Sequence, residues 1–145
     1  MKKHIFLLFL FLSGISMAQT TKEASTSTLP KAQVAESKQS VTLDGKVIPL
    51  LAKAGTMELK DENNRPIALF GFTAYFKENP EKNRPIVFAF NGGPGSSSYW
   101  LHMGVMGPKR IVVDDPNYNA AAPYQLTNNE FSILDVADVV MMDPV

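Results

Sequence analysis

Apolar and polar residues alternate through the first half of the folded part of the chain, which is typical of strands with one buried face. The alternation begins at residues 41–43, and the apolar segment 47–50 follows it. Between these segments stand Asp44 and Gly45, a pair that favours a two-residue hairpin turn. We therefore expect two antiparallel strands joined at this pair. Pro49 lacks an amide hydrogen, so the second strand is expected to lie at a sheet edge.

A longer alternation follows residues 61–66, a polar segment that reads as a turn. Every second position from 68 to 76 is apolar: Ala68, Phe70, Phe72, Ala74 and Phe76. This period of two predicts a half-buried strand. Together these segments predict an antiparallel β meander with one apolar face.

Two later runs are apolar without alternation, at residues 86–90 and 136–142. Strands of this kind are usually buried on both faces, inside a mainly parallel sheet covered by helices. Residues 97–106 are the candidate helix between them. The expected fold class is therefore α/β, with the antiparallel meander leading into a mainly parallel central sheet that is incomplete.

The N-terminus has the three parts of a secretory signal peptide. Lys2 and Lys3 precede an apolar run at 5–12, and small residues flank Met17 near position 18. The run is too short to cross a bilayer. We expect residues 1–18 to be removed on export to the periplasm or the outside, with no membrane contact afterwards.

Residues 19–40 are rich in Ser and Thr and poor in large apolar side chains, so a disordered linker is expected before a domain at 41–145. The 145-residue chain has 14 Lys and Arg residues, 14 Asp and Glu residues and no Cys. Loss of Lys2 and Lys3 leaves a formal charge of −2, which gives no electrostatic basis for nucleic-acid binding. The absence of cysteine excludes disulfides and thiolate chemistry.

The sequence NGGPGSSS at 91–98 follows the run at 86–90. Glycines expose backbone N–H groups, and adjacent N–H groups in a concavity suit an oxyanion or a carboxylate. A tight strand-to-helix connection is an alternative. A dinucleotide-binding βαβ unit is another, with Gly93 and Gly95 as the fingerprint and Asp114 as the ribose ligand. A phosphate-binding P-loop is excluded because no Lys follows the glycines at the required spacing.

This motif resembles that of the serine carboxypeptidase family, the relatives of cathepsin A, and it looks most similar to the bacterial exported branch. Residues 103–108 and 135–145 continue the likeness. The resemblance implies the N-terminal portion of an α/β-hydrolase fold. It also implies that the Gly93 N–H is half of an oxyanion hole, and that Asn91 and the Gly92 N–H bind the C-terminal carboxylate of a peptide or protein substrate.

The catalytic Ser, Asp and His of such an enzyme are expected beyond Val145, because no G-x-S-x-G string occurs in the sequence. The 145 residues alone are therefore expected to be an inactive fragment, without cofactor or metal. The serines at 96–98 are expected to cap or pack, His102 to be a helix residue and Trp100 to lie in the core. A noncatalytic secreted binding module is a further alternative.

Overall fold

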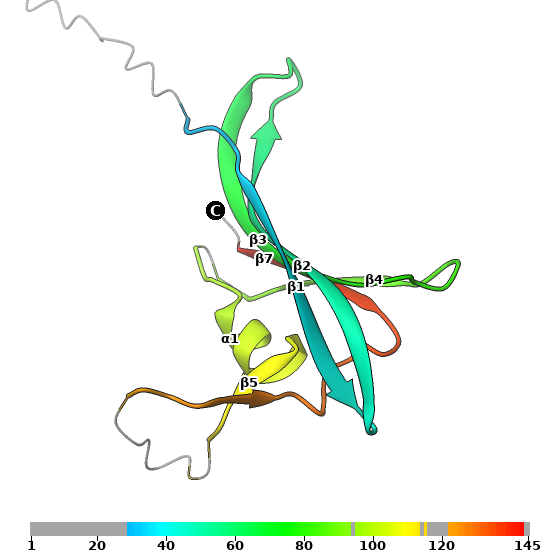
Figure 1. The fold of residues 1–145 in the computed structure, drawn as a ribbon. Coiled ribbons are helices and arrows are strands. Elements are labelled where there is room, and N and C mark those ends of the chain that lie inside the picture. The colour runs from blue at the N-terminus through cyan, green and yellow to red at the C-terminus, as the bar shows by residue number, and fades with distance from the viewer. Residues whose placement is uncertain (1–28, 94, 114, 116–121, 144–145) are drawn as a thin grey trace, which may run out of the picture.

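The computed structural model describes residues 29–93, 95–113, 115 and 122–143. The predicted signal peptide, the first ten residues of the predicted linker, and Asp114 lie outside these residues. The described elements are β1 (Val34–Leu43), β2 (Lys46–Lys60), β3 (Pro66–Lys77), β4 (Ile86–Phe90), α1 (Tyr99–Leu101), the π-helical segment η1 (His102–Met106), β5 (Lys109–Ile111), β6 (Leu126–Asn128) and β7 (Asp138–Asp143). Figure 1 shows their arrangement.

The meander predicted from the alternation is present. β1 and β2 pair antiparallel from Leu43↔Lys46 outward, and the connection is the Asp44–Gly45 pair. Both turn residues have positive φ, 47° for Asp44 and 73° for Gly45, as a primed hairpin turn requires. β2 then pairs antiparallel with β3 beyond the predicted turn. Local turn chemistry therefore set these connections.

Pro49 does not lie in an edge strand, so that prediction is wrong. β2 has β1 on one side and β3 on the other. The Pro49 carbonyl oxygen accepts a hydrogen bond from the Glu78 N–H at 2.9 Å, and Glu78 lies just past the end of β3. N–H and C=O of one residue in an antiparallel strand point to the same neighbour. The missing N–H of Pro49 therefore falls where the β2–β3 ladder ends, and its cost is small.

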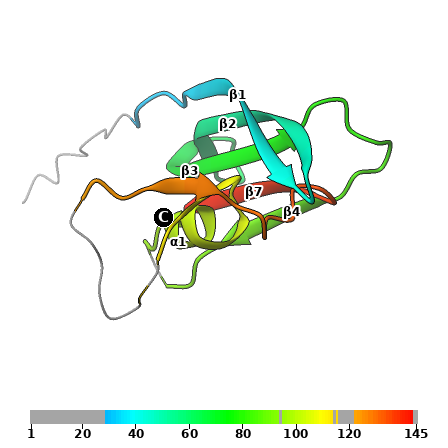
Figure 2. The same ribbon diagram turned by 60° about the horizontal axis from the view of Figure 1, so that its bottom comes forward.

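The main sheet has the strand order β1-β2-β3-β7-β4. β7 runs antiparallel to β3 and parallel to β4. Within the run at 136–142, the residues of β7 are buried or half-buried as expected, and Val139 is fully covered, but Val136 is 62% exposed. β7 owes this burial to its position between two strands and beneath the helical segment that Figure 2 shows beside the sheet.

The α/β fold class, including the α/β-hydrolase portion, is contradicted by the structure. Of the described residues, 51% are in strands and 7% in helices, and the five-stranded sheet is mixed but mostly antiparallel. The candidate helix at 97–106 amounts to α1 and η1 only. The error has a physical cause: runs of apolar residues report burial, and they do not report how a strand is paired or what covers it.

β4 shows this limit directly. It is an edge strand of the main sheet, and Ala89 alone of its five residues is buried. Phe88 and Phe90 are 59% and 64% exposed. Burial on both faces, predicted from the unbroken run, is therefore wrong for β4 in the part of the chain that the structure describes.

The predicted linker is also too long at its C-terminal end, because β1 begins at Val34. Residues 34–40 are mostly exposed and gain their order from backbone pairing with β2. An ion pair of 2.7 Å between Glu36 and Lys53 adds to this pairing. Composition alone missed this strand because its partner ladder, not apolar burial, holds it.

The core lies where the meander, β7 and the helical segment meet. Its buried members come from β1, β2, β3, β4, β7 and the loop before β7: Val41, Leu43, Leu50, Tyr75, Ala89, Leu134, Val139 and Met141. Leu101 of α1 and Met106 of η1 pack against them. The core therefore fixes the short helical segment, and with it the turn that precedes α1, on one face of the sheet.

The segment before β7 is anchored by a buried cation. The Arg84 side chain is 5% exposed and forms an ion pair of 2.9 Å with Asp138. Its guanidinium also donates to three backbone carbonyl oxygens, at distances of 2.7–2.9 Å: those of Leu134, Asp135 and Ala137. These bonds hold the start of β7 against the loop that leads into β4.

Candidate functional site

The glycine turn, residues 91–98, leaves the C-terminal end of β4 and leads into α1. Gly93 has φ 93° and Gly95 has φ 67°, values in the left-handed region that side chains disfavour. Gly92, Gly93 and Gly95 are exposed. A Cβ built on Gly92 or Gly95 would meet no described atom within 4 Å. The glycines here serve backbone conformation and access, not close packing.

The Asn91 side chain is used inside the turn. Its Nδ2 donates to Ser96 Oγ at 3.1 Å and to the Ser97 carbonyl oxygen at 3.4 Å. Its Oδ1 accepts from the N–H of Gly92 at 3.1 Å. The resemblance assigns binding of the substrate carboxylate to Asn91 and Gly92, and the structure brings these two residues together. Their donors are, however, occupied by bonds within the turn.

The Gly93 N–H has no acceptor among the described residues, although the Gly93 carbonyl accepts from the Ser96 N–H at 3.3 Å. An exposed backbone donor of this kind can bind an external anionic oxygen without first losing an internal bond. The Gly93 N–H is therefore a donor of this turn that is available to a ligand.

The far side of the turn is bonded to the end of β7. Asp143 Oδ1 accepts from the Ser98 N–H at 2.6 Å and from Ser97 Oγ at 3.1 Å. The Ser98 hydroxyl donates to the Met142 carbonyl oxygen. Ser98 occupies the N-cap position of α1 but makes no side-chain capping bond. No local sequence pattern predicts these contacts, since Ser98 and Asp143 are 45 residues apart.

His102 is half-buried beside the turn. Its Nε2 lies 2.7 Å from the Tyr75 hydroxyl, and the two rings are 5.5 Å apart between centroids. Burial lowers the pKa of His102 below 6.5, and the negative charge of Asp143 opposes part of that shift. Burial also raises the pKa of Tyr75. The neutral form of His102 is thus favoured.

No nucleophile–base pair forms among the described residues of the turn. Ser97 Oγ bonds to Asp143, and His102 bonds to Tyr75 instead of a serine. Of the serines expected to cap or pack, Ser98 is buried but makes no side-chain capping bond, and Ser97 is exposed. Trp100, expected in the core, is 63% exposed. The adjacent aromatic ring of Tyr99 lies 4.8 Å from it between centroids.

The dinucleotide-binding βαβ unit predicted from Gly93, Gly95 and Asp114 does not form among the described strands, because its two strands are not neighbours in one sheet. β5, which would be its second strand, pairs antiparallel with β6 in a separate two-stranded sheet. The proposed ribose ligand Asp114 lies outside the described residues. The described part of the chain contains no group of three or more His, Cys, Asp or Glu that could hold a metal ion. It also contains no helix that is long and apolar enough to span a bilayer.

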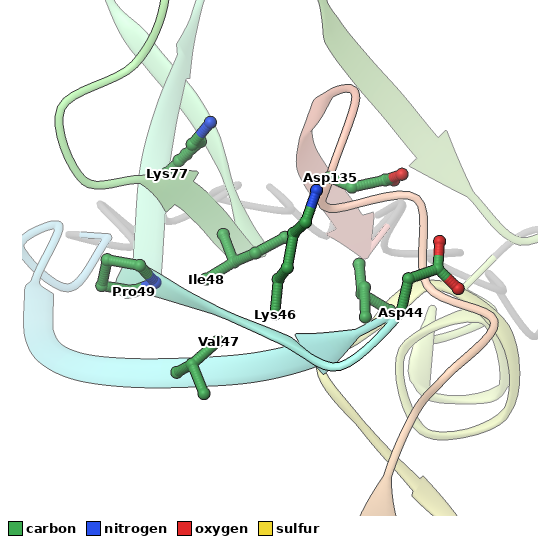
Figure 3. A pocket seen from close by; sticks show the side chains of 8 residues that line it. Asp44, Lys46, Val47, Ile48, Pro49, Lys77 and Asp135 are labelled. Atoms are coloured by element: carbon green, nitrogen blue, oxygen red, sulfur yellow. The ribbon is translucent and has the colours of Figure 1, made fainter.

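A hollow lies beside the β1–β2 hairpin, at the end of β7 opposite the glycine turn (Figure 3). Asp44, Lys46 and Asp135 project around it, and Val47 and Pro49 form part of its apolar wall. Lys77, also at its rim, is paired with Glu81. This hollow has charges of both signs and shares no residue with the glycine turn.

No protein-family model, curated protein or solved structure matches the chain. The geometry of the glycine turn and the motif resemblance are therefore the grounds for a functional proposal.

Proposed function

We propose that the chain is the N-terminal part of an exported serine-type carboxypeptidase, which releases C-terminal residues through an acyl-enzyme. The observation that supports this most is the exposed Gly93 N–H, which lacks an acceptor among the described residues and stands in a positive-φ turn. In the proposal, this N–H stabilises the negative oxygen that forms when a serine attacks the scissile carbonyl.

The same turn would bind the substrate carboxylate. The Gly92 N–H now donates to the uncharged Oδ1 of its neighbour Asn91. A carboxylate is a stronger acceptor, because bonds to an ionised group are about twice as strong as neutral ones. The 3.4 Å bond from Asn91 Nδ2 to the Ser97 carbonyl is long, so that donor would also turn to the carboxylate. One turn would then set the distance from scissile carbonyl to chain end, which explains removal of terminal residues.

In this proposal the nucleophilic Ser, the Asp and the His are contributed by residues beyond Val145. Substrate is a peptide or protein with a free C-terminus, and the reaction needs no cofactor. The formal charge of −2 after removal of residues 1–18 gives no net electrostatic attraction to nucleic acid, so nucleic acid is not a partner in this proposal.

The test begins with the reading frame downstream of Val145 and an assay of the full product. N-blocked dipeptides with a free C-terminus should be cleaved, and their C-terminal amides should be cleaved at least about tenfold more slowly, the equivalent of one hydrogen bond to a charged group. Asn91→Ala should raise KM for the free acid without affecting the amide. The control is Ser40→Ala, at an exposed position of β1, which should leave KM unchanged.

A product that lacks G-x-S-x-G, or that cleaves free acids and amides equally, would contradict the proposal. The first result would favour the noncatalytic secreted binding module. Protection of the protein by NAD would favour the dinucleotide-binding unit.

A further inference from the structure

Asp143, the last residue of β7, joins the main sheet to the glycine turn through its side chain. Its Oδ1 accepts hydrogen bonds from the Ser98 N–H at 2.6 Å and the Ser97 hydroxyl at 3.1 Å. Bonds to an ionised carboxylate are shorter and stronger than neutral ones. The Ser98 hydroxyl adds a bond to the Met142 carbonyl. Three bonds thus connect two consecutive serines of the turn to the end of one strand.

The neighbouring strand leaves space for this carboxylate. Gly71 of β3 is the antiparallel partner of Asp143, so the two residues present the same face of the sheet. A Cβ built on Gly71 would lie 3.1 Å from Asp143 Oδ2, closer than ordinary van der Waals contact. The absence of a side chain at Gly71 therefore leaves room for the Asp143 carboxylate in its position next to the turn. Val139 and Met141, at the alternate positions of β7, share that face and are buried in the core.

The anchored serines are bonded in turn to the start of the motif. Asn91 Nδ2 donates to Ser96 Oγ and to the Ser97 carbonyl, and Asn91 Oδ1 accepts from Gly92. A chain of hydrogen bonds therefore runs from Asp143 through Ser97 to Asn91 and Gly92. Gly93 itself has one internal bond among the described residues, through its carbonyl oxygen. The direction of the Gly93 N–H therefore depends on the residues that flank Gly93.

We propose that Asp143 is a positioning residue for the anion-binding N–H groups of Gly92 and Gly93. This inference rests on the proposed function for what the groups bind, but the positioning itself can be measured without it. Removal of the carboxylate takes away two of the three bonds between these serines and β7 and leaves the bond from Ser98 to Met142, so the turn samples orientations other than the one that now presents the Gly92 and Gly93 N–H groups. Preorganised donors are effective because they need no rearrangement when charge appears.

The experiment compares ¹⁵N-labelled full chains by the amide signals of Gly92 and Gly93, alone and titrated with N-acetylphenylalanine as a carboxylate probe. Asp143→Ala should shift and broaden both signals and weaken probe binding roughly tenfold or more, the scale of a lost bond to a charged group. Asp143→Asn keeps an acceptor oxygen for the Ser98 N–H, so it should restore most of the wild-type spectrum and affinity.

Asp61→Ala is the matched control. Asp61 Oδ1 also accepts two hydrogen bonds, both from backbone N–H groups, of Asn63 and Arg65 at 2.9 Å each, but it closes the β2–β3 turn. Its loss should leave the signals of Gly92 and Gly93 and the probe affinity unchanged. If Asp143→Ala does not fold, Ser97→Ala removes one of the two bonds to the carboxylate and should give a smaller shift in the same direction.

Unchanged Gly92 and Gly93 signals in Asp143→Ala, or equal shifts in Asp61→Ala, would overturn the positioning role. A wild-type chain that does not bind N-acetylphenylalanine would count against the proposed carboxylate site instead. In that case the variant spectra still decide the positioning role.

Discussion

The Tyr75 hydroxyl in β3 lies 2.7 Å from Nε2 of His102, the first residue of η1. This contact joins the antiparallel meander to the helical segment that follows the glycine turn. Both side chains are mostly covered, and Leu101 and Met106 pack against the core on either side of His102. The pair therefore helps to fix the segment on the sheet.

Tyr75→Phe should lower the free energy of unfolding by about 1 kcal/mol, because it removes one partly buried hydrogen bond and leaves the ring in place. Urea denaturation measures the change. Tyr124→Phe is the control, since Tyr124 is 61% exposed and should give no measurable loss. Equal effects of the two substitutions would contradict a stabilising role for the Tyr75–His102 bond.

Stability should also depend on the protonation of His102. Burial lowers its pKa in the folded state below the 6.5 of an exposed histidine, and Asp143 opposes the shift in part. The unfolded chain therefore binds the proton more readily. The contribution of neutral His102 to the free energy of unfolding is fully present above pH 6.5. The free energy of unfolding then falls as the pH drops from 6.5 to the lowered pKa, by at most about 1.4 kcal/mol per pH unit.

Urea titrations between pH 5 and 8, with NMR titration of the His102 ring, would test this. His102 is the sole histidine of residues 19–145. His102→Gln should flatten the profile in that window, and Asp143→Asn should move the His102 pKa lower still. A His102 pKa at or above 6.5 would show that its environment does not disfavour the charged form.

Two glycines of the helical region should respond oppositely to alanine. A Cβ on Gly107 would lie 2.7 Å from His102 Cδ2 and would also crowd the His102 carbonyl, which accepts the Gly107 N–H. Gly107→Ala should therefore cost about 1–3 kcal/mol, as overpacking does. At Gly104 a Cβ meets nothing within 4 Å. Gly104→Ala should be neutral or stabilising by up to about 1 kcal/mol. Melting temperatures of the two variants give the comparison.

Arg84→Met should destabilise the protein by about 3–5 kcal/mol, because it leaves the Asp138 carboxylate buried without its cation. Arg84→Lys should recover little, since an ammonium cannot reproduce three carbonyl contacts with a planar fork of donors. The control is Arg65→Met, which breaks an ion pair with Asp61 in which the Arg65 side chain is 74% exposed. Its effect on the free energy of unfolding, measured by chemical denaturation, should stay within about 1 kcal/mol. Similar losses at both positions would refute this ranking.

Sequence patterns predicted the local elements well. The Asp44–Gly45 pair gave the hairpin, and the period-two run at 68–76 lies within β3. The turn at 61–66 and the buried strand β7 were also anticipated. Each depends on residues close together in the sequence, such as a turn dipeptide or an alternating face, so the information was present in a short window.

Relationships between distant segments were not predictable in this way. Ile86, Phe88 and Phe90 form an apolar run, yet only pairing shows that β4 is an edge strand with one face exposed. The contacts of Asp143 with Ser97 and Ser98 span more than 40 residues. The glycine motif marked the turn, but its orientation depends on a carboxylate that no local pattern selects.

β4 and β7 run parallel, and Phe90 is aligned with Met142. The turn leaves one strand one residue past this alignment, and Asp143 ends the other at the same level. A slip of a single residue would carry the carboxylate about 3.3 Å along the sheet and invert its side chain to the opposite face. Val139 and Met141 share the face of Asp143 and lie in the core, so such a shear between the two strands would disengage the glycine turn and expose these core residues in one step.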